Sequence, residues 1–294
     1  MTSATTARRC FLVTGARVAG LTLLAGIPGL GAAPARAACG RVVALAFASS
    51  LRTLFKASAD AVYRSGDGGR NWTPIALPPA AVSKTLTSIA LSASGKGALY
   101  VAGLGLGVVR SDDGGRHWSA RNKGLPSNDV AALATHADRP GTVYAYLAGR
   151  GIFRSEDGGH HWRLMDAGPR GGITRLVHSN MPGSMQSGWL FAAAPQGVQR
   201  SMDCFCGWHD AGELGRMVRA VAYDRRQPRT VYAATDAGLF SSGDGGDKWS
   251  PSNAPAANIE ALAVAPDGAL YAGGADGSVF RRNGAATAWE RMNA

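Results

Sequence analysis

The sequence lacks the patterns of a helical protein and of a nucleic-acid-binding protein. It shows no long amphipathic helix pattern, only 17% of its 294 residues are charged, and no tract combines basic with aromatic side chains. Its 40 glycines, together with abundant valine, alanine, leucine and threonine, favour many short strands joined by tight turns. The missing basic tract argues against a nucleic acid partner.

Acidic residues are absent from the first 37 residues, which form a predicted targeting segment. Arg8 and Arg9 precede a weakly apolar stretch from Val18 to Ala33, and Ala35-Arg36-Ala37 follows as a small-x-small cleavage pattern. Because glycine and proline interrupt the apolar stretch, a permanent membrane span is not expected. We predict cleavage after Ala37, which leaves a mature chain of residues 38–294 with no transmembrane anchor.

The run Ala7-Arg8-Arg9-Cys10-Phe11-Leu12 resembles the twin-arginine export signal, whose usual form is Ser/Thr-Arg-Arg-x-Phe-Leu-Lys, although it lacks the final lysine. The resemblance implies export of a folded protein across a bacterial inner membrane, and the alternative is an ordinary secretory signal. Either signal predicts a periplasmic or secreted protein. Cleavage removes four arginines and no acid, so the formal net charge falls from +11 to +7, a value that suits an acidic partner.

Six of the seven tryptophans recur at spacings of 46, 44, 46, 41 and 40 residues, which is the period of β-propeller blades. The same phrase, Ser-x-Asp followed by a glycine pair and then Trp, precedes the first five, and the fourth copy alone replaces the glycines. The residues of the five phrases are Ser65, Asp67 and Trp72; Ser111, Asp113 and Trp118; Ser155, Asp157 and Trp162; Ser201, Asp203 and Trp208; and Ser242, Asp244 and Trp249. The sixth tryptophan, Trp289, lacks the phrase.

The phrase predicts a structural hairpin. The aspartate accepts backbone N–H groups in the turn, the glycine supplies a positive φ, and the tryptophan covers the turn with apolar surface. Ser-x-Asp-x-Gly-x-x-Trp is similar to the repeat of the Asp-box, or BNR, family, and this resemblance covers nearly all of residues 40–294.

Four strands recur around each phrase. In the third repeat they are predicted at residues 130–134, 142–146, 151–154 and 161–164, and tyrosines hold one place in the second strand of four repeats: Tyr100, Tyr144, Tyr232 and Tyr271. The first strand is expected near Val42–Phe47 and the last near Trp289–Met292. The sequence therefore predicts an all-β, six-bladed propeller of four-stranded antiparallel blades, residues 38–294, closed without a strand exchanged between the chain ends.

The strand order a, b, c, d of each blade separates two faces. The c–d turns, which carry the Asp-boxes, and the a–b loops lie on one face, the box face; the b–c loops and the d–a connections lie on the other, the box-free face. Propellers that the repeat resembles bind or react on the box-free face. The candidate binding residues there are Arg150, Arg170, Arg175, Arg216, Arg219, Glu213 and Glu260.

Arg175 is the most specific of these candidates. Its repeat equivalents are all small (Ser88, Ala132, Ala220 and Ala261), and its strand lines the central channel. A guanidinium there has the geometry to bind a carboxylate or phosphate with two hydrogen bonds. The alternative is an arginine that fills the channel and pairs with a neighbouring acid or carbonyl.

The mature chain has three cysteines, Cys39, Cys204 and Cys206, and two of them stand in the altered fourth box. In an oxidising compartment we expect one disulfide, either between Cys39 and one of the other two or between Cys204 and Cys206. Met202, the two box cysteines and His209 also make a soft ligand set suited to copper, but the spacing is not specific, and neither a metal nor a cofactor is predicted.

Two functional hypotheses follow from the resemblance. Asp-box sialidases need three convergent arginines, a tyrosine nucleophile with a glutamate, and an acid/base aspartate. This mature chain has only four glutamates, and four of its tyrosines occupy predicted packing positions, so the sequence argues against a sialidase. Other glycoside hydrolases need two carboxylates across the scissile bond, and no spacing here selects such a pair.

The phrases Val62-Tyr-Arg-Ser-Gly-Asp-Gly-Gly69 and Gly238-Leu-Phe-Ser-Ser-Gly-Asp-Gly-Gly246 look like those of photosystem II stability and assembly factor-like propellers, exported proteins that bind membrane-protein segments without chemistry. That group typically has seven blades instead of six. The sequence therefore favours a non-catalytic platform that binds an acidic protein or glycan, with a role as an assembly or stability factor for an envelope complex. A sialidase-like or other glycoside hydrolase is the alternative.

Overall fold

The structure is a computed structural model that describes residues 40–48, 53–93, 97–184, 188–202, 204–205, 207–284 and 288–292. All of these belong to one compact unit, residues 35–294. The predicted targeting segment, Cys39, Asp203 and Cys206 lie outside the described residues. Within the described part of the chain, no helix is long and apolar enough to span a membrane.

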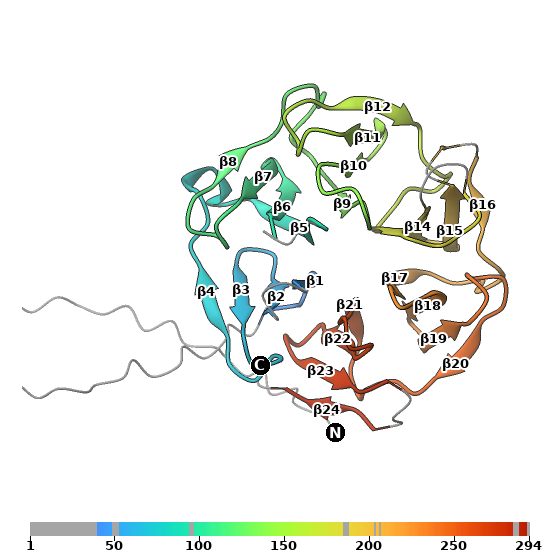
Figure 1. Ribbon diagram of the computed structural model, residues 1–294. Helices are drawn as coiled ribbons and strands as arrows, with labels where there is room; N and C mark the ends of the chain where they lie inside the picture. The colour runs from blue at the N-terminus through green and yellow to red at the C-terminus, as the bar shows by residue number, and fades with distance from the viewer. Residues whose placement is uncertain are drawn as a thin grey trace, which may run out of the picture. The chain divides into compact units, whose positions relative to one another are not determined.

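The described residues form six antiparallel sheets of four strands, arranged as blades around a central axis (Figure 1). The prediction of a six-bladed β-propeller is confirmed. The innermost strands, a, are β1 (Ala44–Ala48), β5 (Thr85–Leu91), β9 (Ala132–Thr135), β13 (Arg175–Ser179), β17 (Val218–Asp224) and β21 (Ile259–Val264). The b strands are β2 (Thr53–Ala57), β6 (Leu99–Leu104), β10 (Val143–Leu147), β14 (Trp189–Ala194), β18 (Gln227–Thr235) and β22 (Leu270–Gly274).

The outer half of each blade contains the c and d strands. The c strands are β3 (Val62–Ser65), β7 (Gly107–Ser111), β11 (Gly151–Ser155), β15 (Gly197–Met202), β19 (Gly238–Ser242) and β23 (Val279–Arg282). The d strands, on the rim, are β4 (Thr73–Ile75), β8 (Ser119–Ala120), β12 (Arg163–Asp166), β16 (His209–Asp210), β20 (Ser250–Ser252) and β24 (Glu290–Arg291). A short 3-10 helix, η1 (Pro79–Ala81), follows β4. The predicted strands of the third blade differ from these bounds by one or two residues.

The apolar core is divided into six clusters, and each lies between two neighbouring blades. The strand tyrosines belong to this core: Tyr100 and Tyr144 are fully buried, and they pair with Arg110 and Arg154 on the adjacent c strand in the same register. Small a-strand residues, mostly alanine, let the blades approach one another closely near the axis. The blades are thus held by face-to-face apolar packing.

The ring closes between the sixth and first blades by the same packing, without an exchanged strand, as predicted. At this seam the Val42 N–H donates to the Gly274 carbonyl oxygen at 3.1 Å, and Arg70 pairs with Glu290 at 3.3 Å. A side chain at Gly273 would overlap Val42, so glycine is required for the close approach of the two blades.

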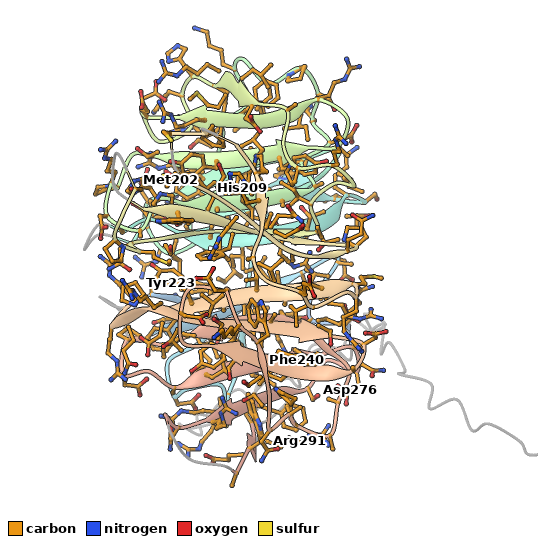
Figure 2. The ribbon with its side chains drawn as sticks, turned by 90° about the vertical axis from the view of Figure 1, so that its right-hand side faces the viewer. Met202, His209, Tyr223, Phe240, Asp276 and Arg291 are labelled. Carbon is orange, nitrogen blue, oxygen red and sulfur yellow. The ribbon has the colours of Figure 1, made fainter. Side chains whose placement is uncertain are left out.

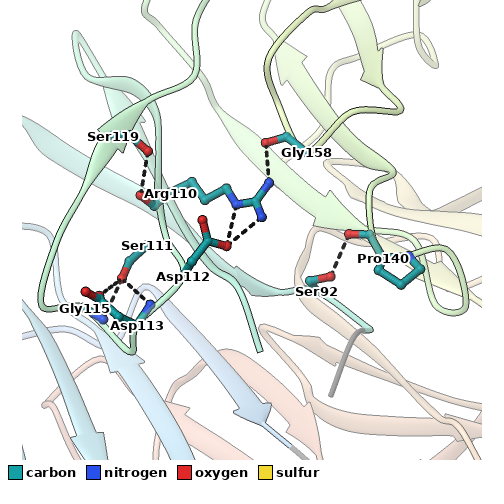
Figure 3. Close-up of polar contacts among 9 residues, drawn as sticks. All are labelled: Ser92, Arg110, Ser111, Asp112, Asp113, Gly115, Ser119, Pro140 and Gly158. Atoms are coloured by element: carbon teal, nitrogen blue, oxygen red, sulfur yellow. Dashed lines mark hydrogen bonds and ion pairs between the residues drawn. The ribbon is translucent and has the colours of Figure 1, made fainter. Parts of the chain in front are cut away.

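The four boxes that the structure describes in full share one hydrogen-bond pattern, which Figure 3 shows for the second blade. Ser111 Oγ donates to Asp113 Oδ1 at 2.8 Å and accepts the Gly115 N–H at 2.8 Å. Asp113 Oδ1 also accepts the backbone N–H groups of Arg116 and His117. Both glycines of each pair have a positive φ, between 71° and 97°, which is why glycine stands there.

The second, third and fifth boxes also join their own blades to the preceding ones. The indole N–H of Trp162 donates to the Arg121 carbonyl oxygen at 2.7 Å, and Trp118 and Trp249 make the same bond to Ala76 and Ala211. Arg110, one residue before the second box, donates across the next blade boundary to the Gly158 carbonyl oxygen (Figure 3). The boxes therefore stabilise the ring as well as their own hairpins.

The altered fourth box keeps part of this arrangement. Phe205 takes a φ of 54° at the place where the other boxes have the second glycine, a strained conformation for a phenylalanine. Its ring packs 6.0 Å from that of Tyr144 in the third blade, and Cys204 beside it is disulfide-bonded. The apolar contact and the covalent link offset the backbone strain. The other cysteines lie outside the described residues, so the pairing stays a prediction.

We expect Trp162→Phe to lower the free energy of unfolding by about 1–2 kcal/mol, because the Arg121 carbonyl oxygen loses its indole donor. Chemical denaturation followed by circular dichroism measures the change. Tyr100→Phe is the matched control, because the buried Tyr100 hydroxyl has no hydrogen-bond partner and its removal should be neutral or slightly stabilising. Equal effects of the two variants would contradict a stabilising contribution from the indole hydrogen bond.

The box aspartates predict a loss of stability in acid. Partial burial raises the pKa of Asp67, but the Asn71 and Arg70 backbone N–H groups and the Ser65 and Asn71 side chains outweigh it, and the pKa falls from 3.8 to about 2. Because the pKa of Asp67 is lower in the folded than in the unfolded state, its carboxylate stabilises the fold at pH values above the unfolded-state pKa. This stabilisation is lost as pH falls from about 4 to 2. The denaturation midpoint should drop over this window, and less steeply in Asp67→Asn. Asp236→Asn, outside any box, should keep the full slope; a parallel flattening in both variants would contradict the assignment.

Candidate functional site

The six a strands surround a central channel that contains two cavities. The larger, about 520 Å³, is lined by the later halves of these strands and by a–b loop residues such as Arg226 and Pro266, so it opens on the box face. The smaller, about 80 Å³, lies nearer the box-free face and is lined by Arg175 and by small a-strand residues, which are Ala44, Ser88, Ala220 and Ala261. Figure 2 shows the two faces from the side, with Tyr223 toward one and Asp276, in a b–c turn, toward the other.

Arg175 closes the channel below the larger cavity. Its Nη1 donates to the Thr174 carbonyl oxygen at 2.7 Å, and its Nη2 donates to the Val43 carbonyl oxygen at 2.5 Å. Thr174 and Val43 belong to the fourth and first blades, which face each other across the ring (Figure 1). Burial, with a smaller effect of Arg41 and opposed by Glu260, lowers the pKa of Arg175 to about 10, so the side chain remains a cation at neutral pH.

Glu260 lies at the centre of an ion-pair cluster at the box-free mouth of the channel. Its side chain is 5% exposed, and its two carboxylate oxygens accept from Arg41 at 2.7 Å and from Arg219 at 3.1 Å. The electrostatic influence of both Arg41 and Glu260 on Arg175 places the four groups near one another. Three arginines against one glutamate leave this mouth with an excess of positive charge.

The structure thus brings together Arg175, Arg219 and Glu260 among the candidate residues. Arg150, Arg170 and Glu213 are exposed in loops of the same face, with Arg170 five residues before Arg175 and Glu213 six residues before Arg219. Arg216 is also exposed; its Nε donates to the Leu214 carbonyl oxygen at 3.3 Å, and its Nη1 lies 3.8 Å from Asp236. The loop arginines therefore ring the cluster as separate charges.

Sequence reasoning missed two features of the channel. It did not single out Arg41, although this residue directly precedes the first a strand, as Arg219 starts the fifth. It also placed all candidates on the box-free face, whereas the larger cavity opens on the box face. The sequence signal for that cavity is weak, because its walls are ordinary strand residues and its rim is set by the lengths of the a–b loops.

Exposed apolar side chains also gather on the box-free face. Val82 and Met217, which lie in d–a connections, are 70% and 43% exposed, and Leu104 in a b–c turn is 45% exposed. The Lys84 side chain lies against Gly105, next to Leu104, which brings the first d–a connection beside that turn. The box-free face therefore combines positive charge with separate apolar side chains and only a shallow cavity.

Glycoside hydrolysis requires two carboxyl groups across the scissile bond. Neither cavity is lined by an aspartate or glutamate. The carboxyl groups with a shifted pKa among the described residues, Asp67, Asp113, Asp157, Asp244 and Asp276, are all shifted downward, chiefly by hydrogen bonds in boxes and turns. A general acid needs a raised pKa instead.

No metal centre is formed by the described residues, which contain no cluster of three or more His, Cys, Asp or Glu side chains suited to a metal ion. Of the soft ligand set in the fourth box, Cys204 is in a disulfide and is therefore not a free thiolate ligand. Met202 lies toward the same side as Tyr223 in Figure 2.

Comparisons with known proteins agree on the fold. A family model described as strictosidine synthase-like, N-terminal, matches residues 260–282, a part of the sixth blade. No curated protein matches the chain. Among solved structures, the GH74 enzyme of Niastella koreensis is 16% identical with a TM-score of 0.57; the match covers 84% of this chain but 46% of the enzyme, so this chain spans about half of its length.

Two further structures have a length closer to that of this chain. YCF48 from Cyanidioschyzon merolae is 17% identical, with a TM-score of 0.56 over 86% of this chain and 85% of that one. A structure of YCF48 bound to D1 peptide is 18% identical, with a TM-score of 0.54 over 85% and 94%. At these identities the likeness defines a class, the β-propellers, and leaves the partner to be argued from the site.

The ion-pair cluster predicts that Glu260→Gln lowers the free energy of unfolding by about 2–4 kcal/mol, because it leaves Arg41 and Arg219 without their buried counter-charge. Thermal and chemical denaturation at neutral pH measure this. Glu213→Gln removes the same charge from an exposed loop of the same face and should change stability by less than about 0.5 kcal/mol. If both variants behave alike, the cluster does not stabilise the channel mouth.

Proposed function

We propose that this protein is an exported, non-catalytic propeller that binds an acidic segment of a protein partner on its box-free face. The observation that carries the proposal is the excess of arginine around the buried Glu260, on a face whose cavity is only about 80 Å³. Ligand-enclosing pockets are usually about 300–1,000 Å³. A shallow cationic surface suits a macromolecular partner better than a small substrate.

The neighbouring side chains support a protein partner. Exposed arginines supply charge-assisted hydrogen bonds to carboxylates, and apolar side chains such as Val82 and Leu104 add contact area that excludes water. The peptide-bound YCF48 structure shows that a propeller of this shape binds a peptide. Export through the predicted targeting segment at residues 1–37 would place the binding face in the periplasm or outside the cell.

Glycoside hydrolysis is the weaker hypothesis. The similarity to GH74 enzymes extends over about half of their length, and the two channel cavities lack carboxylate linings. A glycan partner without hydrolysis would use the same arginines if the glycan carried carboxylate or sulfate groups.

A charge-reversal pair tests the proposal. In cells that produce the tagged full-length chain, cross-linked partners are captured and quantified for Arg150→Glu/Arg170→Glu and for Arg116→Glu/Lys248→Glu. Both pairs change the net charge equally, but the second lies in boxes on the opposite face. We expect the first pair to lower recovery of a specific partner about tenfold or more by like-charge repulsion, and the second pair to leave it unchanged.

Equal recovery from both variants would contradict the proposal. The same preparations are assayed with chromogenic glycosides, including a sialoside. If the protein hydrolyses a glycoside and this activity is lost in Glu213→Gln or Glu260→Gln, the function of this face is hydrolysis and not binding alone.

A further inference from the structure

The larger cavity has an arrangement of side chains that the proposed function does not use. It is a funnel on the box face, about 520 Å³ in volume, closed below by Arg175. Each blade contributes one residue of its a strand to the wall of the funnel. In the fourth blade this residue lies three positions after Arg175, and in the other blades it lies three positions after the repeat equivalent of Arg175. These wall residues are Phe47, Leu91, Thr135, His178, Tyr223 and Val264.

The funnel wall carries no net charge of its own at neutral pH. Burial, with His136 and Arg139, lowers the pKa of His178 to about 3, so this imidazole is neutral. Burial raises the pKa of Tyr223 to about 12, so its phenol is neutral as well. Of the other wall residues, Phe47, Leu91 and Val264 are apolar and Thr135 adds a hydroxyl, so most of the wall presents an apolar surface to a bound molecule.

Among the described residues, Arg225 and Arg226 line the funnel at its rim, the titratable His136 lines it beside His178, and no aspartate or glutamate lines it. Arg225 is committed to the fold, since its Nη atoms donate to the Ala137 carbonyl oxygen and to Asp138 Oδ1. Arg225 therefore fixes the shape of the rim without offering a free donor pair.

Arg226 is in a different state. Its Nε forms an ion pair with the buried Asp224 Oδ1 at 3.7 Å, a distance too long for a hydrogen bond, and its side chain is 50% exposed. Within the described part of the chain, the Nη atoms of Arg226 make no hydrogen bond. The guanidinium packs over the turn at Gly268, on the next blade, and so stands at the rim of the funnel with donors to offer.

We propose that this funnel binds a small amphipathic carboxylate, with its carboxylate on Arg226 and an aromatic or branched aliphatic body against Phe47, Tyr223 and Val264. The volume lies within the range of about 300–1,000 Å³ of pockets that enclose small ligands. An apolar wall with one cationic group at the rim favours a molecule that has one charged end and an apolar body. The site is separate from the box-free face and does not depend on a protein partner.

Fluorescence titration of the full-length chain with 2-naphthoate tests this site, with 2-naphthamide as the uncharged counterpart. We expect saturable binding of 2-naphthoate at one site, about tenfold weaker binding of 2-naphthamide, and about tenfold weaker binding of 2-naphthoate to Arg226→Gln. Because Arg226→Gln removes the group that distinguishes the two probes, this variant should bind both equally.

Arg64→Gln is the matched control, because it removes the same charge from an exposed position on β3 that lines neither cavity of the channel. It should bind 2-naphthoate as the unaltered protein does. The proposal is overturned if 2-naphthoate does not saturate, if both probes bind the unaltered protein equally, or if Arg64→Gln weakens binding as much as Arg226→Gln.

Discussion

The indole hydrogen bonds from Trp118, Trp162 and Trp249 to the preceding blades are the interactions on which the ring depends. A four-stranded blade buries little apolar surface alone, so its stability comes from its two neighbours. The tryptophan supplies both a large apolar surface and a directed bond, as Trp162 does to Arg121 at 2.7 Å. Because the donor lies in the c–d turn, the serine–aspartate hydrogen bonds that shape the turn also set the position of each blade on the next.

The fold was predictable because its determinants are local and repeated. Ser111, Asp113 and Trp118 lie within eight residues of one another, and every copy of this phrase predicts the same hairpin. The strand tyrosines were recognisable for the same reason, and Tyr100 and Tyr144 are buried in equivalent registers. Ring closure followed from the count of whole blades. These inferences needed only sequence order and period.

The site was predictable only in part, because it depends on contacts between blades. The contrast of Arg175 with its small equivalents marked it as exceptional, but its bond to Val43, 132 positions away, has no local signal. The association of Arg41 with Glu260 spans 219 positions. The funnel was missed because neither Tyr223 nor Arg226 departs from an expected pattern; its shape arises when six a–b loops meet around one axis.

The two ends of the channel differ because the sixfold repeat is broken differently at each. At the box-free end, the residues that depart from the repeat are charged. Arg41 and Arg219 pair with Glu260, and the channel is closed there. At the box end, the inward residues stay apolar and the charges stand at the rim, so the channel remains open. Arg175 separates the two environments by spanning the ring. A rigid, repetitive scaffold thus holds two chemically distinct surfaces, and a substitution at one end should leave the other unchanged.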